Sequence, residues 1–484
     1  MSLSTALSIA QSALLATSRQ TSVVTRNVAD ADNPNYSRRI ALVTSTSPGA
    51  RSVDVQRAAN DLLFRQNLGA LSAYAGQSAL YSGMDQLDVS VNGVDNASSP
   101  STAIGNLQQA LQLYATSPSN QNLGASVIDA AKQVVRSLNE GSKAIQDFRT
   151  QTDGQIDTAV KDLNSLLNQF QDANTAVMSG TRSGTDVSDA LDQRDALLKK
   201  IANYIPVSTF TRGDNDMVIT TGDGTTLFET IPRTVSFAPS SGYAAGAAGN
   251  TVYIDNVPVS AGSGGNTTAS GTIAGLLQLR DGVASTMQGQ LDETARGLIT
   301  AFAETAPSMP NAAGLFTWPG APAVPAAGTL VDGIAGTIKI NAAMDPSAGG
   351  NPTLLRDGGA NGAAYIANTT GGPSYSNLLV AYGDQLDKPM TFDPSAGISA
   401  TSSVADYAAN SIGWLQGIRQ QASTAADAKE ALAQRSADAL SNATGVNVDQ
   451  EMSLMLDLEH TYQASARMMK TVDDMMTALL NAVG

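Results

Sequence analysis

The sequence predicts an α+β multidomain protein: N- and C-terminal helices paired as a coiled coil, a helical rod domain, and an inserted β-rich outer domain. Apolar residues recur at helical spacing at both ends of the chain, whereas segments of the middle change to a period of two. Aromatic residues make up only 5% of the composition, which favours long thin helices and small β modules over a large core. A chain of 484 residues is also expected to divide into several domains.

Charge and residue usage exclude several functions. The 28 basic and 43 acidic residues give a net charge of −15, which repels phosphate backbones, so no nucleic-acid partner is expected. There is no Cys, and the single His is His460, so a His/Cys zinc site cannot form and a Ser-His-Asp triad could use only that imidazole. We therefore expect no enzyme activity, no cofactor and no metal. A secreted enzyme with helical ends is the alternative class.

Hydropathy gives no sign of a membrane span, because no uninterrupted apolar run approaches the required ~18 residues. The first residues, LSTALSIAQSALLATS, lack the basic start of a signal peptide, and polar residues interrupt their apolar run. If the protein leaves the cytoplasm, we expect it to do so without an ordinary cleaved signal.

The N-terminal segment predicts a helix with a heptad seam of small and partly hydroxylic residues. The seam consists of Leu3, Leu7, Ala10, Leu14, Thr17, Thr21, Val24 and Val28. Such a helix is marginal by itself in water, so it needs a partner.

The C-terminal segment predicts a second helix, running almost to the last residue, with Asp449 as a plausible N-cap. Its seam consists of Val448, Glu451, Met455, Leu458, Tyr462, Ser465, Met469, Val472, Met476, Leu479 and Val483. Only Glu451 and Ser465 are polar. The two apolar stripes are expected to pair, and their surplus apolar surface favours assembly with further copies. A helical hairpin buried against an ordinary domain explains the pattern equally well.

Between the first helix and the next segment, the sequence predicts a sharp turn. Pro34 cannot lie inside a helix and disfavours helical geometry at Asn33, while Asn35 also favours a turn. The following RRIALVTSTS predicts a short extended piece. Residues 1–57 hold six Arg and three Asp, so this basic region either meets an acidic surface of a neighbouring copy or is simply solvated.

Both ends carry motifs that resemble those of the flagellar axial proteins, the rod, hook and hook-associated families. At the N-terminus the matching residues are Asn27, Asn33, Tyr36 and Arg38, around Pro34, with Asn35 where Gly is usual. Asn tolerates left-handed geometry, so this departure is mild. At the C-terminus the matching residues are Gly445, Val446, Asn447, Asp449, Glu451, Tyr462, Ala464, Ser465, Ala466, Arg467, Leu479, Leu480 and Asn481.

The middle of the chain predicts helices near residues 54–88, 101–115, 123–150, 155–178 and 190–204, with a linker at 179–189. After Pro206 it predicts a hairpin over 217–228, turning at Gly-Asp-Gly, then strands in TVSF and TVYIDNVPVS, and a flexible connector at 262–271. Helices return at 273–304 and 404–440, on either side of a Pro-, Gly- and Ala-rich stretch. Asp192, Arg194 and Asp195 are interpreted as a surface charge set rather than a catalytic group.

These elements predict three discontinuous domains. The terminal coiled-coil domain takes residues 1–50 with 445–484. The helical rod domain takes 51–205 with 271–304 and 401–444. The β-rich outer domain takes 206–270 with 305–400.

Two internal stretches resemble the hook-associated protein 1 family in particular. They are LDQRDALLKKIANYIPVSTFTRGDNDMVITTGDGTTLF and GTIAGLLQLRD. The resemblance implies a structural subunit of the bacterial flagellum at the hook–filament junction, with terminal helices forming an inner tube. It also implies extracellular localisation after type III export without a cleaved signal peptide. The alternative within the class is hook-associated protein 3 or the hook subunit.

The same resemblance implies the partners. These are copies of the chain itself, the hook protein on one side, hook-associated protein 3 on the other, and an export chaperone on the C-terminal helix. The Met455, Met469 and Met476 stripe is a plausible chaperone face, although these residues could equally pack only in the assembled tube.

Overall fold

In this computed structural model, residues 3–47, 50–259 and 270–483 are described. The chain forms two compact units, each built from separated stretches. Unit 1 comprises Met1–Tyr74, Lys161–Val235 and Ala428–Gly484, and unit 2 comprises Ala75–Val160 and Ser236–Asp427. The unit boundaries fall within α2 (Asp61–Asn92), α4 (Gln121–Ser183), α11 (Val404–Thr444) and the short β7 (Val235–Ser236). The three-domain division stays a prediction.

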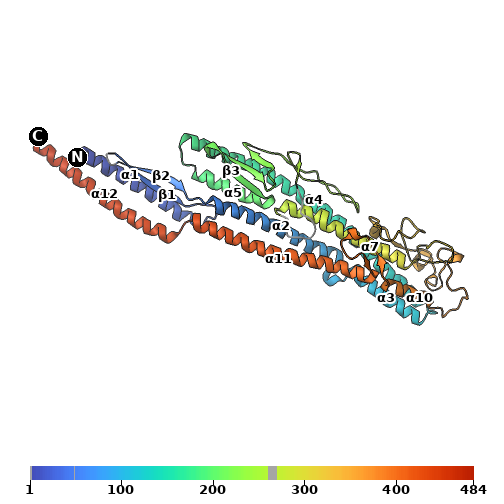
Figure 1. Cartoon of the computed structure of the whole chain (residues 1–484). Helices are drawn as coiled ribbons and strands as arrows, with labels where there is room; N and C mark the ends of the chain where they lie inside the picture. Colours follow the sequence, from blue (N-terminus) through green and yellow to red (C-terminus); the bar gives the residue numbers. More distant parts are fainter. Residues whose placement is uncertain (1–2, 48–49, 260–269, 484) are drawn as a thin grey trace. The chain divides into compact units, whose positions relative to one another are not determined.

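Unit 1 combines long helices with two small antiparallel sheets. Its further elements are α1 (Leu3–Ala29), β1 (Arg39–Thr46), β2 (Ala50–Arg57), α5 (Ser188–Tyr204), β3 (Val207–Thr211), η2 (Gly213–Asn215), β4 (Met217–Thr221), β5 (Thr226–Glu229), β6 (Ile231–Pro232) and α12 (Val448–Val483). Strands β1 and β2 form a hairpin that packs on α1, while β3, β4, β5 and β6 form one sheet in that order. The two terminal helices, α1 and α12, lie side by side (Figure 1).

The buried positions of α1 and α12 follow the predicted seams. In α1 the most buried seam residues are Ala10, Thr17 and Val24, spaced seven apart. In α12 they are Glu451, Leu458 and Ser465, also seven apart. The seam residues between them are mostly half-buried, whereas Tyr462 and Leu479 are about half exposed, at 48% and 53%. The two polar residues of the C-terminal seam are thus among its most buried members.

The sheet of unit 1 contains the predicted hairpin over 217–228, which is confirmed as β4 and β5. Its Gly-Asp-Gly forms the turn, where Gly224 has a φ of 90°, a conformation that favours glycine. The inner face of β4 is buried, and Phe228 of β5 meets Phe170 of α4 edge-to-face at 4.9 Å between ring centroids.

Unit 2 is mainly helical with long irregular connections. Its further elements are η1 (Val94–Asn96), α3 (Pro100–Thr116), β8 (Tyr253–Ile254), β9 (Val257–Pro258), α6 (Thr272–Leu277), the π-helix η3 (Gln278–Val283), α7 (Ala284–Ala301), β10 (Phe316–Thr317), α8 (Ile334–Thr337), β11 (Lys339–Ile340), η4 (Pro346–Ala348), α9 (Leu354–Asp357), η5 (Ala363–Tyr365), α10 (Asn377–Asp387), β12 (Met390–Thr391), η6 (Pro394–Ala396) and β13 (Thr401–Ser402). Almost every residue of α7 is buried, polar ones included. No helix in the described ranges combines the length and hydropathy needed to cross a bilayer.

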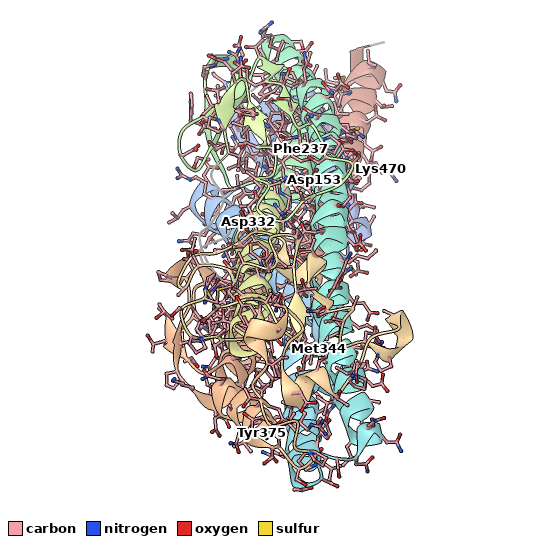
Figure 2. The ribbon with its side chains drawn as sticks, turned by 90° about the vertical axis from the view of Figure 1, so that its right-hand side faces the viewer. Asp153, Phe237, Asp332, Met344, Tyr375 and Lys470 are labelled. Atoms are coloured by element: carbon pink, nitrogen blue, oxygen red, sulfur yellow. The ribbon has the colours of Figure 1, made fainter. Side chains whose placement is uncertain are left out.

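A buried ionic cluster in unit 2 holds the connection after Ser236 against α4. Asp153 of α4 pairs with Arg280 and accepts hydrogen bonds from Tyr243 Oη, at 2.9 Å, and the Ser240 amide, at 2.5 Å. The Arg280 guanidinium lies over the Phe237 ring, 5.7 Å from its centroid. Figure 2 labels Asp153 and Phe237, which contact the Arg280 guanidinium. Because the charges are paired and hydrogen-bonded, they can remain buried.

Several predicted boundaries were wrong. The two helices predicted at 123–150 and 155–178 are one helix, α4, because the break assigned near Gly154 is helical and the apolar period continues through it. Residues 54–57 belong to β2 rather than to a helix. The stretch 305–400 was predicted to be β-rich, but its strands are only two residues long and short helices α8, α9 and α10 occur among them. Most of the predicted connector at 262–271 lies outside the described residues.

Close helix packing in unit 2 depends on Gly275. A Cβ at this position would lie 2.7 Å from the backbone oxygen of Gly76 in α2. We expect Gly275→Ala to destabilise unit 2 by about 1–3 kcal/mol, because backbone cannot yield as a side chain can. Urea unfolding followed by the fluorescence of Trp318 and Trp414, both in unit 2, measures this.

The matched control is Gly105→Ala in α3, where a Cβ would meet nothing within 4 Å. There we expect stabilisation of about 0.5–1 kcal/mol from the loss of glycine's flexibility. Equal effects at the two positions would contradict the close-approach argument.

Candidate assembly site at the paired termini

The turn after α1 returns the chain to the helix it has just left. The Asn33 side chain accepts a hydrogen bond from the Asn35 amide at 3.0 Å, and the Asn33 carbonyl accepts one from the Tyr36 amide at 3.0 Å. Pro34 is exposed in this turn. The backbone of Asn35 does not adopt positive φ, so the left-handed geometry expected there is not used. The reversal brings Tyr36, Arg38 and Arg39 back beside Asn27.

Asn27 is the buried centre of the N-terminal motif. Its Oδ1 accepts hydrogen bonds from Tyr36 Oη, at 2.8 Å, and the Arg39 amide, at 2.9 Å. Its Nδ2 donates to the Arg39 carbonyl, at 2.9 Å, and to Glu451 Oε2, at 3.0 Å. The side-chain amide therefore uses both donors and both acceptor positions, and it connects α1, β1 and α12.

Glu451 ties the start of α12 to this motif. It is fully buried, and its Oε1 accepts a 2.6 Å hydrogen bond from Arg38 Nε. The Arg38 amide donates to the carbonyl of Thr444, the last residue of α11, at 2.7 Å. The N-terminal motif thus contacts both sides of the α11–α12 junction. The residue that caps α12 is Asn447, whose Oδ1 accepts from the Gln450 amide at 3.1 Å, so the assignment of Asp449 as N-cap was wrong.

Three aspartates on one face of α5 bind three arginines of the N-terminal region. Arg26 pairs with Asp189 at 2.5 Å, and Arg39 pairs with Asp192 at 2.5 Å. Arg57 then pairs with Asp192 at 2.7 Å and with Asp195 at 2.5 Å. We call Asp189, Asp192 and Asp195 the α5 acidic row. Half of the basic residues of segment 1–57 are thereby neutralised within the same chain.

This row corrects the interpretation of Asp192, Arg194 and Asp195 as a surface charge set. Asp192 and Arg194 are only 8% and 4% exposed. Arg194 lies on a different side, where it donates to Asn174 Oδ1 at 3.0 Å and to the Asn215 carbonyl at 2.6 Å. The signal available in the sequence was the three-residue spacing of the aspartates, which places them on one helix face.

Burial and ion pairing set the protonation of this site. Burial raises the pKa of Tyr36 to about 12, so its hydroxyl remains a donor to Asn27. The hydrogen bond from Arg26 lowers the pKa of Asp189. Burial raises the pKa of Asp195, while Arg57 opposes that rise.

The predicted site residues therefore divide into two groups. Asn27, Asn33, Tyr36 and Arg38 come together around Glu451, with Pro34 in the adjoining turn. Most of the predicted seam residues are buried or half-buried, whereas Val448, Tyr462 and Leu479 are exposed. The buried and half-buried ones are Leu7, Ala10, Leu14, Val24, Val28, Met455, Leu458, Met469, Val472 and Met476. The side chain of Leu3 lies outside the described residues. Their roles in assembly and chaperone binding stay predictions.

Chemically, the arrangement holds chain segments together. Among residues 3–47, 50–259 and 270–483, no group of three or more His, Asp or Glu is placed to hold a metal ion.

Comparisons with known proteins agree with this geometry. The family model described as the flagellar hook-associated protein FlgK helical domain matches residues 84–307. The model described as the flagellar basal body rod FlgEFG protein C-terminal matches residues 439–482, which include the α11–α12 junction. Flagellar hook-associated protein 1 of Bacillus subtilis is 21% identical and is covered over 98% of its length, using 99% of this chain.

Two further relatives are more partial. The Salmonella typhimurium protein of the same name is 22% identical, over 62% of this chain and 56% of its own length. The structure of the flagellar hook junction protein FlgK from Burkholderia pseudomallei is 19% identical, with a TM-score of 0.43, and covers 52% of this chain and 46% of its own. That structural likeness is too low to carry an argument about the fold.

The match at residues 439–482, which include Glu451, relates the C-terminal part of the chain to the axial proteins of the flagellar rod. Over residues 84–307 and over its full length, the chain is similar to flagellar hook-associated protein 1 in particular.

Loss of the Asn27 side chain tests the terminal site. Asn27→Ala leaves the Arg39 amide and the Tyr36 hydroxyl without their acceptor and removes one donor from Glu451. We expect about 2–3 kcal/mol of destabilisation from the buried groups left unpaired. Hydrogen exchange should show faster exchange at both 36–39 and 447–455, although these segments are far apart in sequence.

The control is Asn35→Ala, at an exposed position in the same turn. We expect this variant to stay within about 0.5 kcal/mol of the wild type. If Asn27→Ala loosens only the N-terminal segment, Asn27 does not couple the termini.

The lowered pKa of Asp189 predicts a pH dependence for unit 1. A carboxylate whose pKa is lower in the folded than in the unfolded state stabilises the fold above its unfolded pKa, and this contribution is lost as the pH falls through the folded pKa. Asp189→Asn should therefore cost at most about 1 kcal/mol at pH 7, since the pair is mostly exposed. The difference from wild type should begin to shrink as the pH falls below the ordinary pKa of 3.8 and should disappear only below the lower pKa of the folded state.

Thermal unfolding by circular dichroism across this pH range measures the effect. Asp172→Asn, at an exposed position of α4 in the same unit, is the control and should show no such pH-dependent difference. A constant difference between wild type and Asp189→Asn at all pH values would contradict the prediction.

Proposed function

We propose that this chain is a structural subunit of the bacterial flagellum that forms the junction between hook and filament and assembles through its terminal helices. One observation supports this above all. We call the buried hydrogen bonds that join Asn27 and Arg38 to Glu451 the polar lock. It fixes one face of α12, while other faces of the same helix expose large apolar side chains.

The exposed apolar surface of α12 is extensive. Leu454, Met468 and Met475 are 39%, 62% and 53% exposed and lie at heptad intervals, so they form one stripe along the helix. Met452, Leu456 and Leu480 add further exposed apolar surface. Contiguous apolar patches of this kind mark interaction sites in soluble proteins. Burial between neighbouring copies would remove this surface from water.

The N-terminal region offers a second such surface. Ile40 and Leu42 of β1 are 39% and 41% exposed, and they pair with the polar Gln56 and Asp54 across the hairpin. Leu15 of α1 is 67% exposed. A helical hairpin buried against an ordinary domain, the open alternative, would cover most of these side chains.

The partners follow from the proposed role. They are further copies of the chain, the hook protein, hook-associated protein 3, and an export chaperone on α12. The protein would act outside the cell, after export without a cleaved signal peptide, with an inner tube of terminal helices and outer parts around it. The role is mechanical, and no covalent bond is made or broken.

Gene deletion with complementation tests this role. A deletion strain should carry hooks without filaments and release flagellin into the medium, as seen by electron microscopy and immunoblotting. Wild type should restore filaments. Met468→Asp combined with Met475→Asp should not, because two carboxylates would be buried at each subunit contact, at several kcal/mol each.

The matched control is Gln463→Asp combined with Thr477→Asp, which adds the same charge at exposed positions outside the stripe. It should restore filaments. A deletion strain with no hook at all would indicate a hook subunit instead, and a strain with intact filaments would refute the proposal.

A further inference from the structure

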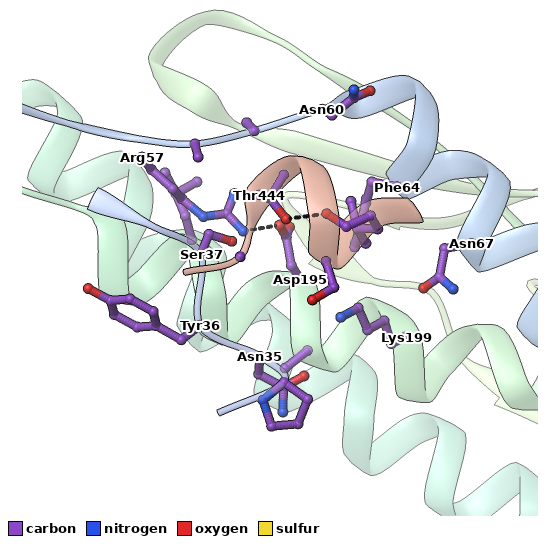
Figure 3. A pocket seen from close by; sticks show the side chains of 18 of the residues that line it. Asn35, Tyr36, Ser37, Arg57, Asn60, Phe64, Asn67, Asp195, Lys199 and Thr444 are labelled. Atoms are coloured by element: carbon purple, nitrogen blue, oxygen red, sulfur yellow. Dashed lines mark hydrogen bonds and ion pairs between the residues drawn. The ribbon is translucent and has the colours of Figure 1, made fainter. Parts of the chain in front are cut away.

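Beside the terminal site, unit 1 contains an open cavity of about 1010 Å³. Its walls come from the turn after α1, the start of α2, α5, strands β3 and β4, and the end of α11. Figure 3 shows Asn60 just before α2, Phe64 of α2, Asp195 and Lys199 of α5, and Thr444 of α11 around it. All of these elements belong to the same unit at this point of the chain.

Two arginines of the cavity wall have fixed partners, whereas Lys199 has none among the described residues. Arg57 is paired with Asp192 and Asp195, and Arg194 donates to Asn174 and Asn215. Lys199 is half-buried in the wall, and the described residues supply no hydrogen bond or ion pair for its ammonium. Asp195, one helical turn before it, already binds Arg57 at 2.5 Å. A half-buried cation without a fixed partner favours an anionic ligand.

The wall of the same cavity also carries an exposed aromatic side chain. Phe210 of β3 also lines the cavity, yet it is 55% exposed. A ring with that exposure at the edge of a hollow is a typical anchor for a protein partner. The wall also carries the exposed carboxylates of Asp32, Asp61 and Asp438, so a small free anion gains less here than a segment that can place one acidic group at Lys199 and apolar groups at Phe210.

The geometry points to a second copy of this chain as the occupant, bound through an acidic and apolar segment that places a carboxylate at Lys199 and an apolar side chain on Phe210. The chain supplies such segments in abundance, since it has 43 acidic residues against 28 basic ones. The inference rests on the proposed function, because only assembly places many copies side by side. It adds a lateral contact that the terminal helices do not make.

Crosslinking in assembled flagella tests the inference. Phe210 is replaced by the photoreactive p-benzoylphenylalanine in the complementing gene, and irradiated flagella are analysed by immunoblotting and mass spectrometry. We expect a crosslink between two copies of the chain. Adding Lys199→Glu should lower its yield about tenfold, as expected when a charge pair worth about 1.4 kcal/mol is lost.

Three controls keep the result specific. Lys200→Glu changes the adjacent, exposed lysine by the same charge and should leave the yield unchanged. The photoreactive residue at Ile231, which is 56% exposed in the same unit but outside the cavity wall, should show no dependence on Lys199. Lys199→Arg, which keeps the charge, should retain the crosslink.

The remaining outcomes are decisive. A crosslink from position 210 to another protein, no crosslink in intact filaments, or a yield unaffected by Lys199→Glu would each overturn the lateral contact while leaving the proposed function standing. Failure of the proposed function is recognised separately, because the deletion strain would then keep its filaments.

Discussion

The fold of unit 1 depends on one buried hydrogen bond between residues 424 positions apart, from Asn27 Nδ2 to Glu451 Oε2. Around it, the motif after α1 supplies Tyr36, Arg38 and Arg39, and the α11–α12 junction supplies Thr444 and Glu451. A buried carboxylate is costly unless it is fully paired, so Glu451 is tolerated only in the one register that gives it both Arg38 and Asn27. The apolar seam alone would permit α1 and α12 to slide past each other by one heptad. The hydrogen bonds to Glu451 fix a single register between the two helices.

The α5 acidic row fixes the β1–β2 hairpin in the same way, by pairing its charged side chains with distant partners. Asp189, Asp192 and Asp195 fix Arg26, Arg39 and Arg57, which lie on α1, β1 and β2 in turn. Neutralising these arginines inside the chain leaves the apolar surfaces of α12 and the β1–β2 hairpin as the features that distinguish its exterior. Recognition between copies would then depend on apolar stripes and on isolated charges such as Lys199, rather than on the basic character of the N-terminal segment.

The sequence predicted those features of the fold that depend on the local spacing of apolar residues. The seam positions at Ala10, Thr17 and Val24 and the hairpin over 217–228 were recoverable, because burial there follows regular spacing. The pairing of Asn27 with Glu451 and of Arg57 with Asp192 could not be predicted, because local sequence does not specify which distant side chain each residue will contact. The continuity of α4 was missed, since the break predicted between residues 150 and 155 lies inside one helix. In 305–400, glycine and proline obscured short helices that only tertiary packing stabilises.

The separation of 424 positions between Asn27 and Glu451 has a consequence for synthesis. The acceptor for Arg38 and Asn27 exists only once residue 451 has been synthesised, so the N-terminal motif cannot close earlier. A copy that stops before residue 451 would leave Asn27 Nδ2 and Arg38 Nε without the carboxylate that accepts their hydrogen bonds. Synthesis past residue 451 is therefore a structural precondition for an ordered N-terminal motif.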